Sequence, residues 1–291
     1  CRASATRRTS ERLTRPSARL DAEVDDRAAT SADGTPIPYR LVRRRDLDPA
    51  TPRPALVFVY GGFNVALLPG WPLPALAAWV AAGGLLVVGH VRGGGEFGPD
   101  WWRGGQLANK HNSFLDLYAI AEDLVARGDT TRKELGVYGI SNGGGIAAVA
   151  AVKRPDLFRA VAAQLPLTDQ FALVRDPITS MIARMEDGDP HDPAMSTLLY
   201  SWSPYHNVVD GAAYPAVLLD CATNDPRCLP WHGRKLAARL QRATSSGRPV
   251  LLRIRQSAGF RPAGDGARRQ QQEELLAFFA DQLGLALPRT P

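Results

Sequence analysis

The sequence predicts an α/β fold built on a doubly wound, mostly parallel sheet. Short apolar runs alternate along the chain with longer amphipathic stretches. Such uninterrupted apolar runs are typical of strands that helices cover on both faces, as in parallel sheets. The chain has 291 residues, of which 45% are hydrophobic, and this is enough to bury one large core.

Each element follows from its own pattern. Strands are predicted where a short run is apolar and ends at turn residues, at residues 36–42, 55–60, 85–90, 135–140, 160–164, 215–221 and 250–255. Helices are predicted where apolar residues recur at helical spacing, at residues 73–82, 113–127, 143–152, 231–240 and 270–283.

Two segments stand outside this alternation. Residues 167–200 are rich in Asp, Pro and Met, and we expect them to form a cap over the edge of the sheet. Residues 1–30 are polar, rich in Arg and weakly periodic. We therefore expect a linker there and one folded domain over residues 31–287.

The charge distribution argues against a nucleic-acid or membrane partner. The net charge is +6, but outside residues 2–19 the basic residues are scattered and lie next to acids. A solvated basic surface explains this pattern better than a nucleic-acid site does. The chain has no apolar run of about 18 residues, which a membrane span needs. The N-terminus also lacks the apolar segment of a signal peptide, so we expect a cytoplasmic protein.

Neither a disulfide framework nor a metal site is expected. The odd count of three cysteines argues against a framework. Cys221 falls in an apolar run and is predicted to be a buried thiol, although a Cys221–Cys228 bridge stays possible. No cofactor is expected, because the histidines show no metal-ligand spacing; they are His90, His111, His191, His206 and His232.

A serine lies in a sharp turn between a predicted strand and a predicted helix. The run reads Gly139-Ile140-Ser141-Asn142-Gly143, with apolar residues before it and small residues after it. Flanking glycines let the backbone close around the serine, and backbone N–H groups at the helix start can stabilise an oxyanion. This is the nucleophile turn of the α/β-hydrolase fold, so Ser141 is predicted to be a nucleophile.

The order of a catalytic triad on this fold is serine, acid and then histidine. Asp225 follows the predicted strand at residues 215–221 and is the expected acid, with Asp220 inside that strand as the alternative. The histidine should follow the strand at residues 250–255. The loop there reads Gln-Ser-Ala-Gly-Phe-Arg-Pro over residues 256–262 and contains no histidine.

Over about residues 31–285 the chain resembles the prolyl oligopeptidase family. The matching motifs are Ser31-Ala32-Asp33-Gly34-Thr35, Tyr60-Gly61-Gly62-Phe63-Asn64, Arg92-Gly93-Gly94-Gly95-Glu96, Asn109-Lys110, Ser141-Asn142-Gly143-Gly144 and Ser203-Pro204-Tyr205-His206-Asn207. The resemblance implies a serine peptidase that cuts short peptides after proline, and a β-propeller upstream. No propeller is present in this chain, and residues 1–30 match at most the last propeller strand and its linker.

The resemblance also implies roles for single residues. Ser141 matches the nucleophile and Asp225 the acid of the triad. The hydroxyl of Tyr60 and the backbone N–H of Asn142 match the oxyanion donors. Substrate contacts are implied for Arg227, which would hold a carbonyl, and for Phe63, which would line the proline pocket. Without the resemblance, Tyr60 and Phe63 would be interpreted as core aromatics and Arg227 as a surface ion-pair partner.

Two departures from the family bear on function. The family's tryptophan that stacks on the substrate proline is expected within residues 178–188, which contain none, so the preference for proline is left open. Phe260 stands where the family's Ala-Gly-His-Gly loop has its histidine. A serine without a base loses turnover on the order of 10⁶-fold. His206 and His232 match family residues outside the triad, so they are not expected to replace it.

Two explanations of Phe260 stay open. The histidine is lost, which gives a pseudo-peptidase or binding domain. Alternatively, a short His-Gly-x stretch belongs between Gly259 and Phe260, because Arg261-Pro262 matches the family's basic-proline pair. We favour a serine peptidase acting on peptides or small acyl substrates. The other hypotheses are the binding domain and an ester- or amide-processing hydrolase of specialised metabolism.

Overall fold

One eight-stranded sheet forms the centre of the protein. The computed structural model describes residues 20–175, 177–256, 259 and 264–287. The strands lie in the order β1-β2-β4-β3-β5-β6-β7-β8. The pairs β1·β2 and β2·β4 are antiparallel, and all other neighbours are parallel. The strands are β1 (Ala22–Thr30), β2 (Pro36–Arg44), β3 (Ala55–Val59), β4 (Leu85–Gly89), β5 (Leu135–Ile140), β6 (Ala160–Gln164), β7 (Ala216–Ala222) and β8 (Val250–Arg255).

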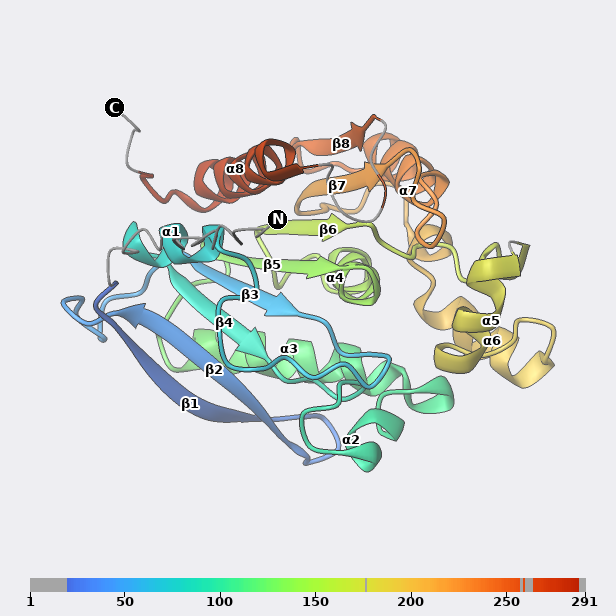
Figure 1. Cartoon of the computed structure of the whole chain (residues 1–291), viewed down its shortest axis with the longest axis horizontal. Coiled ribbons are helices and arrows are strands. Elements are labelled where there is room, and N and C mark those ends of the chain that lie inside the picture. The colour runs from blue at the N-terminus through green and yellow to red at the C-terminus, as the bar shows by residue number, and fades with distance from the viewer. Residues whose placement is uncertain (1–19, 176, 257–258, 260–263, 288–291) are drawn as a thin grey trace, which may run out of the picture.

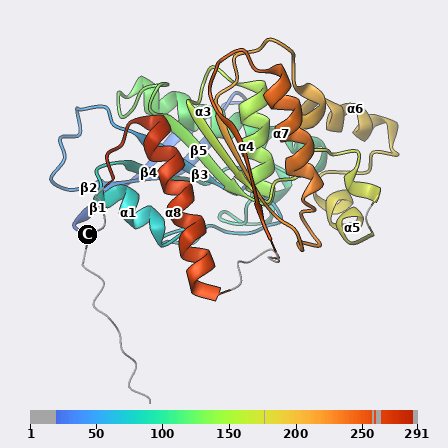
Figure 2. The same ribbon diagram turned by 90° about the horizontal axis from the view of Figure 1, so that it is seen from above.

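Helices cover both faces of the sheet, which confirms the predicted doubly wound α/β fold (Figures 1 and 2). One face carries α1 (Ala75–Ala81) and α8 (Gly264–Leu283). The other face carries α3 (His111–Ala126), α4 (Asn142–Lys153) and α7 (Trp231–Ala243). Two separate layers of buried side chains result, one on each side of the sheet.

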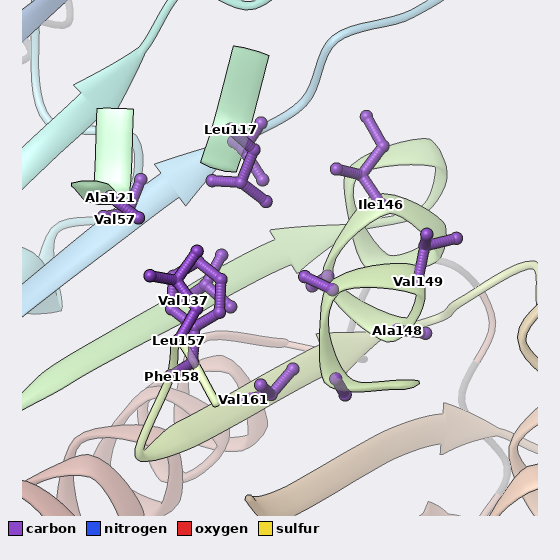
Figure 3. Close-up of a cluster of buried hydrophobic side chains, with 14 of the residues drawn as sticks. Val57, Leu117, Ala121, Val137, Ile146, Ala148, Val149, Leu157, Phe158 and Val161 are labelled. Carbon is purple, nitrogen blue, oxygen red and sulfur yellow. The ribbon is translucent and has the colours of Figure 1, made fainter. Parts of the chain in front are cut away.

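The central strands are apolar because they are buried on both faces. Every residue of β3 and β4 is buried. Figure 3 shows the larger layer, where α3 and α4 meet the central strands; its members include Leu117, Ile146, Val57, Val137 and Val161. Burial of such side chains contributes about 1.5–3 kcal/mol each, so this layer fixes α4 and the turn at its start.

The expected domain boundary at residue 31 is wrong. Residues 22–30 form β1, which pairs along its whole length with β2 at the edge of the sheet. Only Ala29 is buried in this strand, so it lacks the apolar run that would have revealed it. Helix α8 begins at Gly264, six residues before the predicted start at residue 270. Its first two turns are exposed, so they lack the apolar pattern on which the prediction was based.

A buried arginine ties the first hairpin to the rest of the sheet. Arg92 donates through Nε to Asp116 Oδ2 at 2.9 Å and also forms ion pairs with Asp116 and Asp33. Ser31 donates to the same Asp116 carboxylate at 2.7 Å. These contacts explain why the motifs around Ser31 and Arg92 occur together, since they support the loop that follows β4.

The segment after β6 forms the expected cap. It contains η2 (Leu173–Arg175), α5 (Pro177–Glu186) and α6 (Pro193–Trp202). Figure 1 shows α5 and α6 beyond the carboxyl ends of the parallel strands. The remaining short helices are α2 (Pro99–Arg103), η1 (Leu107–Asn109) and η3 (Pro204–Asn207). No helix among the described residues is long and apolar enough to cross a membrane.

Candidate active site

Ser141 lies in a strained turn between β5 and α4. Its φ of 57° and ψ of −118° are unusual for a residue with a side chain. The turn is held by hydrogen bonds from Ser141 N to Gln164 O at 2.8 Å and from Gly145 N to Ser141 O at 3.0 Å. A Cβ on Gly139 would lie 2.0 Å from Gly143 O, so the close approach of strand and helix requires glycine.

The serine opens into an apolar pocket beneath the cap. The pocket has a volume of about 320 Å³, and Tyr60, Phe63 and Arg227 line it together with Ser141. The structure therefore brings together residues that lie far apart in the sequence. The other wall is built mainly of apolar side chains from the cap and the β7–α7 loop, among them Leu167, Leu173, Ile182, Ala183, Met185 and Cys228.

Tyr60 and Asn142 are fixed to one another. The Asn142 side chain donates from Nδ2 to Tyr60 O at 2.6 Å and to Gly61 O at 3.0 Å. Burial raises the pKa of the Tyr60 hydroxyl, and nearby Cys228 and Glu186 raise it further. The hydroxyl is therefore protonated at neutral pH and can donate a hydrogen bond into the pocket.

Asp225 has one carboxylate oxygen with partners and one without. The side chain is 1% exposed, and Oδ1 accepts hydrogen bonds from Arg227 N at 2.9 Å and Cys228 N at 3.1 Å. Within the described residues Oδ2 is buried and has no hydrogen-bond partner. Gly259, which follows β8 in the chain, lies near the residue before Asp225, since a Cβ on Gly259 would lie 3.5 Å from Asn224 O.

Asp220, the alternative acid, has a different environment. Its Oδ1 accepts from Arg255 Nε at 2.9 Å and its Oδ2 accepts from Gln271. It also lines a second pocket, against α8 rather than beneath the cap. Both oxygens of Asp220 therefore have partners, unlike those of Asp225 within the described residues.

None of the histidines in the described residues contacts Ser141. His232 is buried and accepts from Thr168 N at 3.1 Å through Nδ1, and burial lowers its pKa to about 3. His206 shares a 2.9 Å hydrogen bond with Ser203. Both imidazoles therefore have partners other than Ser141. Phe260, at the expected position of the base, lies outside the described residues.

The contact that Ser141 does make is with a thiol. Its Oγ lies 3.7 Å from Cys228 Sγ. Burial raises the pKa of Cys228 to about 12, so this thiol is not a base at neutral pH. Cys221 is also buried, and both cysteines are unbridged.

Comparison with known proteins places this chain in a family. A model of the prolyl oligopeptidase family matches residues 73–286, which is well over half of the chain. The chain belongs to the prolyl oligopeptidase family. It is 39% identical over 231 residues to an uncharacterised peptidase, y4nA, of Sinorhizobium fredii, covering 78% of this chain and 32% of that one. It is 33% identical over 258 residues to a prolyl endopeptidase of Elizabethkingia meningoseptica, covering 89% of this chain and 36% of that one.

Solved structures agree with this assignment. A prolyl endopeptidase structure superposes with a TM-score of 0.86 and 33% identity, covering 92% of this chain and 39% of that one. Oligopeptidase B from Leishmania major gives 0.86 and 29%, covering 91% and 37%. The chain thus spans about a third of the length of the curated relatives it matches.

A buried cluster of charged side chains, which the sequence pattern did not predict, joins the start of α3 to the end of α5. Lys110 donates to Glu186 Oε1 at 2.9 Å and lies 3.7 Å from Asp187 Oδ1. All three side chains are buried. The sequence offered one signal, because Asn109-Lys110 is among the family motifs, but nothing linked it to Glu186, which lies 76 residues away, or to Asp187.

Replacing Asp187 with asparagine is expected to stabilise the protein above pH 6. Burial raises the pKa of this carboxyl from 3.8 to about 6. Between these values the folded state keeps a proton that the unfolded state has released, so stability falls as pH rises through this window. Two units correspond to about 3 kcal/mol, an upper limit for the gain of Asp187→Asn at pH 7.5.

Denaturant unfolding at pH 4 and pH 7.5 measures this effect. The gain of Asp187→Asn should shrink towards zero at pH 4. Asp100→Asn is the control, since that side chain is 99% exposed, and it should change little at either pH. Equal gains for Asp187→Asn at both values would contradict the prediction.

Proposed function

We propose that this domain hydrolyses peptide bonds through an acyl-enzyme formed on Ser141. Ser141 Oγ attacks the substrate carbonyl carbon, and the carbonyl oxygen becomes an oxyanion held by Tyr60 and the backbone N–H of Asn142. The proton of the hydroxyl passes to the imidazole that the family resemblance expects after Gly259, and from there to the leaving amine. Water, deprotonated by the same base, then cleaves the acyl-enzyme and releases Ser141.

The observation that supports this proposal most strongly is the second oxygen of Asp225. A buried carboxylate oxygen with no partner costs about 1–3 kcal/mol or more, and Oδ2 lacks one within the described residues. In a serine triad this oxygen accepts from the N–H of the base histidine. Gly259, which lies near Asn224, belongs to the segment in which the family resemblance expects that histidine, and this supports the role proposed for Asp225.

The pocket supports a substrate with an apolar group next to the cleaved bond. Arg227 and Phe63 line it at the side of Ser141, which suits contacts with a substrate carbonyl and an apolar side chain. Ile182 and Ala183 occupy the wall where the family resemblance expects a tryptophan. We therefore propose peptides or small acyl compounds as substrates, without a strict requirement for proline.

The whole protein's organisation is also a proposal. Curated relatives are about three times longer than the aligned region, since the match covers 32–36% of their length. We propose that a β-propeller upstream limits access to the pocket. A cytoplasmic location remains our expectation.

Phe260 favours a second candidate, a non-catalytic domain that binds peptides. With Phe260 directly after Gly259, no imidazole follows β8, and serine is a poor nucleophile at neutral pH. The aliphatic pocket wall favours a third candidate on the same site, an ester- or amide-processing hydrolase. Comparing p-nitrophenyl esters with peptide substrates separates it from a peptidase, because turnover of peptides alone would contradict it.

Labelling with a fluorophosphonate tests the proposal directly. We expect covalent modification at Ser141, identified by peptide mass spectrometry, and none in Ser141→Ala. The same peptide mass spectrometry also determines whether residues intervene between Gly259 and Phe260. A folded natural protein that is not labelled over many hours would favour the binding domain.

A further inference from the structure

Lys110 connects the turn that carries Tyr60 to the wall of the substrate pocket. Its ammonium lies at the start of α3, 2% exposed, and donates to Asn142 Oδ1 at 2.9 Å and to Glu186 Oε1 at 2.9 Å. Asn142 begins α4 and Glu186 ends α5. One buried cation therefore joins three segments that are distant in sequence.

Lys110 supplies one of the three hydrogen bonds that hold the Asn142 side-chain amide, the one to its oxygen. With Oδ1 held by Lys110, Nδ2 faces Tyr60 O and Gly61 O, 2.6 and 3.0 Å away. An amide can only use its oxygen as an acceptor and its nitrogen as a donor. Loss of the ammonium would leave Oδ1 buried without this donor, and the amide would then be held only through Nδ2.

We propose that Lys110 is a positioning residue for the oxyanion site, acting through Asn142 on the Tyr60-Gly61 turn. This inference rests on the proposed acyl-enzyme function. The tyrosine hydroxyl and the Asn142 N–H must meet the oxyanion at hydrogen-bond distance, and they lie on the two segments that the Asn142 side chain joins. A displacement of about 1 Å in such a site can cost on the order of 10²-fold in rate.

The wall of the pocket at the end of α5 is also held by bonds that do not reach the Tyr60-Gly61 turn, which we call the oxyanion turn. Trp102 Nε1 donates to Glu186 Oε2 at 3.1 Å, and Gln106 Nε2 donates to Met185 O at 2.7 Å. These bonds do not involve Lys110. Removal of the ammonium is therefore expected to affect the oxyanion turn more than the binding of the substrate's apolar group.

A structural role for Lys110 must be distinguished from positioning. Its charge balances buried Glu186 and Asp187, so Lys110→Met alone leaves two buried acids without a cation and lowers stability. The triple variant Lys110→Met/Glu186→Gln/Asp187→Asn removes all three charges. It should recover stability while Asn142 still lacks its ammonium donor.

The test compares wild type, Lys110→Met, the triple variant and Lys153→Met. The last is the control, because Lys153 of the wild-type protein is an exposed lysine on α4 that contacts Asn207. For fluorophosphonate labelling of Ser141 we expect the maximal rate to fall about 10- to 100-fold in both Lys110 variants. The probe's binding constant should change less than about threefold. Hydrogen–deuterium exchange should accelerate at residues 60–65 in both, and Lys153→Met should match wild type.

Wild-type labelling in the triple variant would overturn the inference, because charge balance would then explain the effect. Unchanged exchange at residues 60–65 in Lys110→Met would overturn it as well. If wild type itself is not labelled, the proposed function fails separately. Faster exchange in both Lys110 variants would then still support positioning of this turn.

Discussion

Inserting His-Gly-Ala between Gly259 and Phe260 is expected to raise the labelling of Ser141 by about 10³- to 10⁶-fold over the chain with Phe260 directly after Gly259. The insertion adds an imidazole directly after Gly259, which lies near Asn224, the residue before Asp225. Its N–H can then pair with Oδ2, which lacks a partner within the described residues. The other ring nitrogen can accept the proton of Ser141. The second-order rate constant for a fluorophosphonate measures the gain.

A Gln-Gly-Ala insertion is the matched control, because it gives the loop the same length without a base. It should leave Ser141 almost as unreactive as before, and combining the histidine insertion with Asp225→Asn should remove most of the gain. Equal labelling with either insertion would mean that loop length, not the imidazole, limits the site. The comparison thus distinguishes a site that lacks only the base from a site in which other catalytic groups are also misplaced.

The sequence predicted the centre of this molecule because its local patterns and its tertiary packing agree. Strands such as β3 and β4 are buried on both faces, so their apolar runs were informative. Gly139 is required by a backbone contact with Gly143 within the turn itself, which a short motif can encode. The pairing of Ser141 with the pocket residues Tyr60, Phe63 and Arg227 followed from the family resemblance, and the structure gathers them in one cavity.

What the sequence left out depends on contacts between distant segments. Strand β1 owes its structure to pairing with β2, since eight of its nine residues are not buried. The cluster of Lys110, Glu186 and Asp187 joins the start of α3 to the cap, and no local pattern marks a lysine that pairs with an acid 76 residues away. The spacing of apolar residues along the chain does not reveal such long-range polar contacts, although these contacts can determine the geometry of a site.

Replacing Gly143 with alanine is expected to reduce the free energy of unfolding by at least about 4 kcal/mol, the range reached when a substitution disrupts a buried region. A Cβ at this position would lie 2.2 Å from Val59 O and 2.9 Å from Tyr60 Cα. These are backbone atoms of β3 and the oxyanion turn, so no side-chain rotation can relieve the overlap. Denaturant unfolding of wild type and variant measures the loss.

Gly266→Ala provides the matched control for the same chemical change within a helix. Its Cβ would meet nothing within 4 Å in the exposed first turns of α8. Alanine there should increase the free energy of unfolding by about 0.5–1 kcal/mol, because it favours the helix more than glycine does. A Gly143→Ala protein with wild-type stability would mean that α4 can move away from β3. Because Ser141 precedes α4, the same movement would displace the nucleophile, so labelling of Gly143→Ala should fall even in molecules that remain folded.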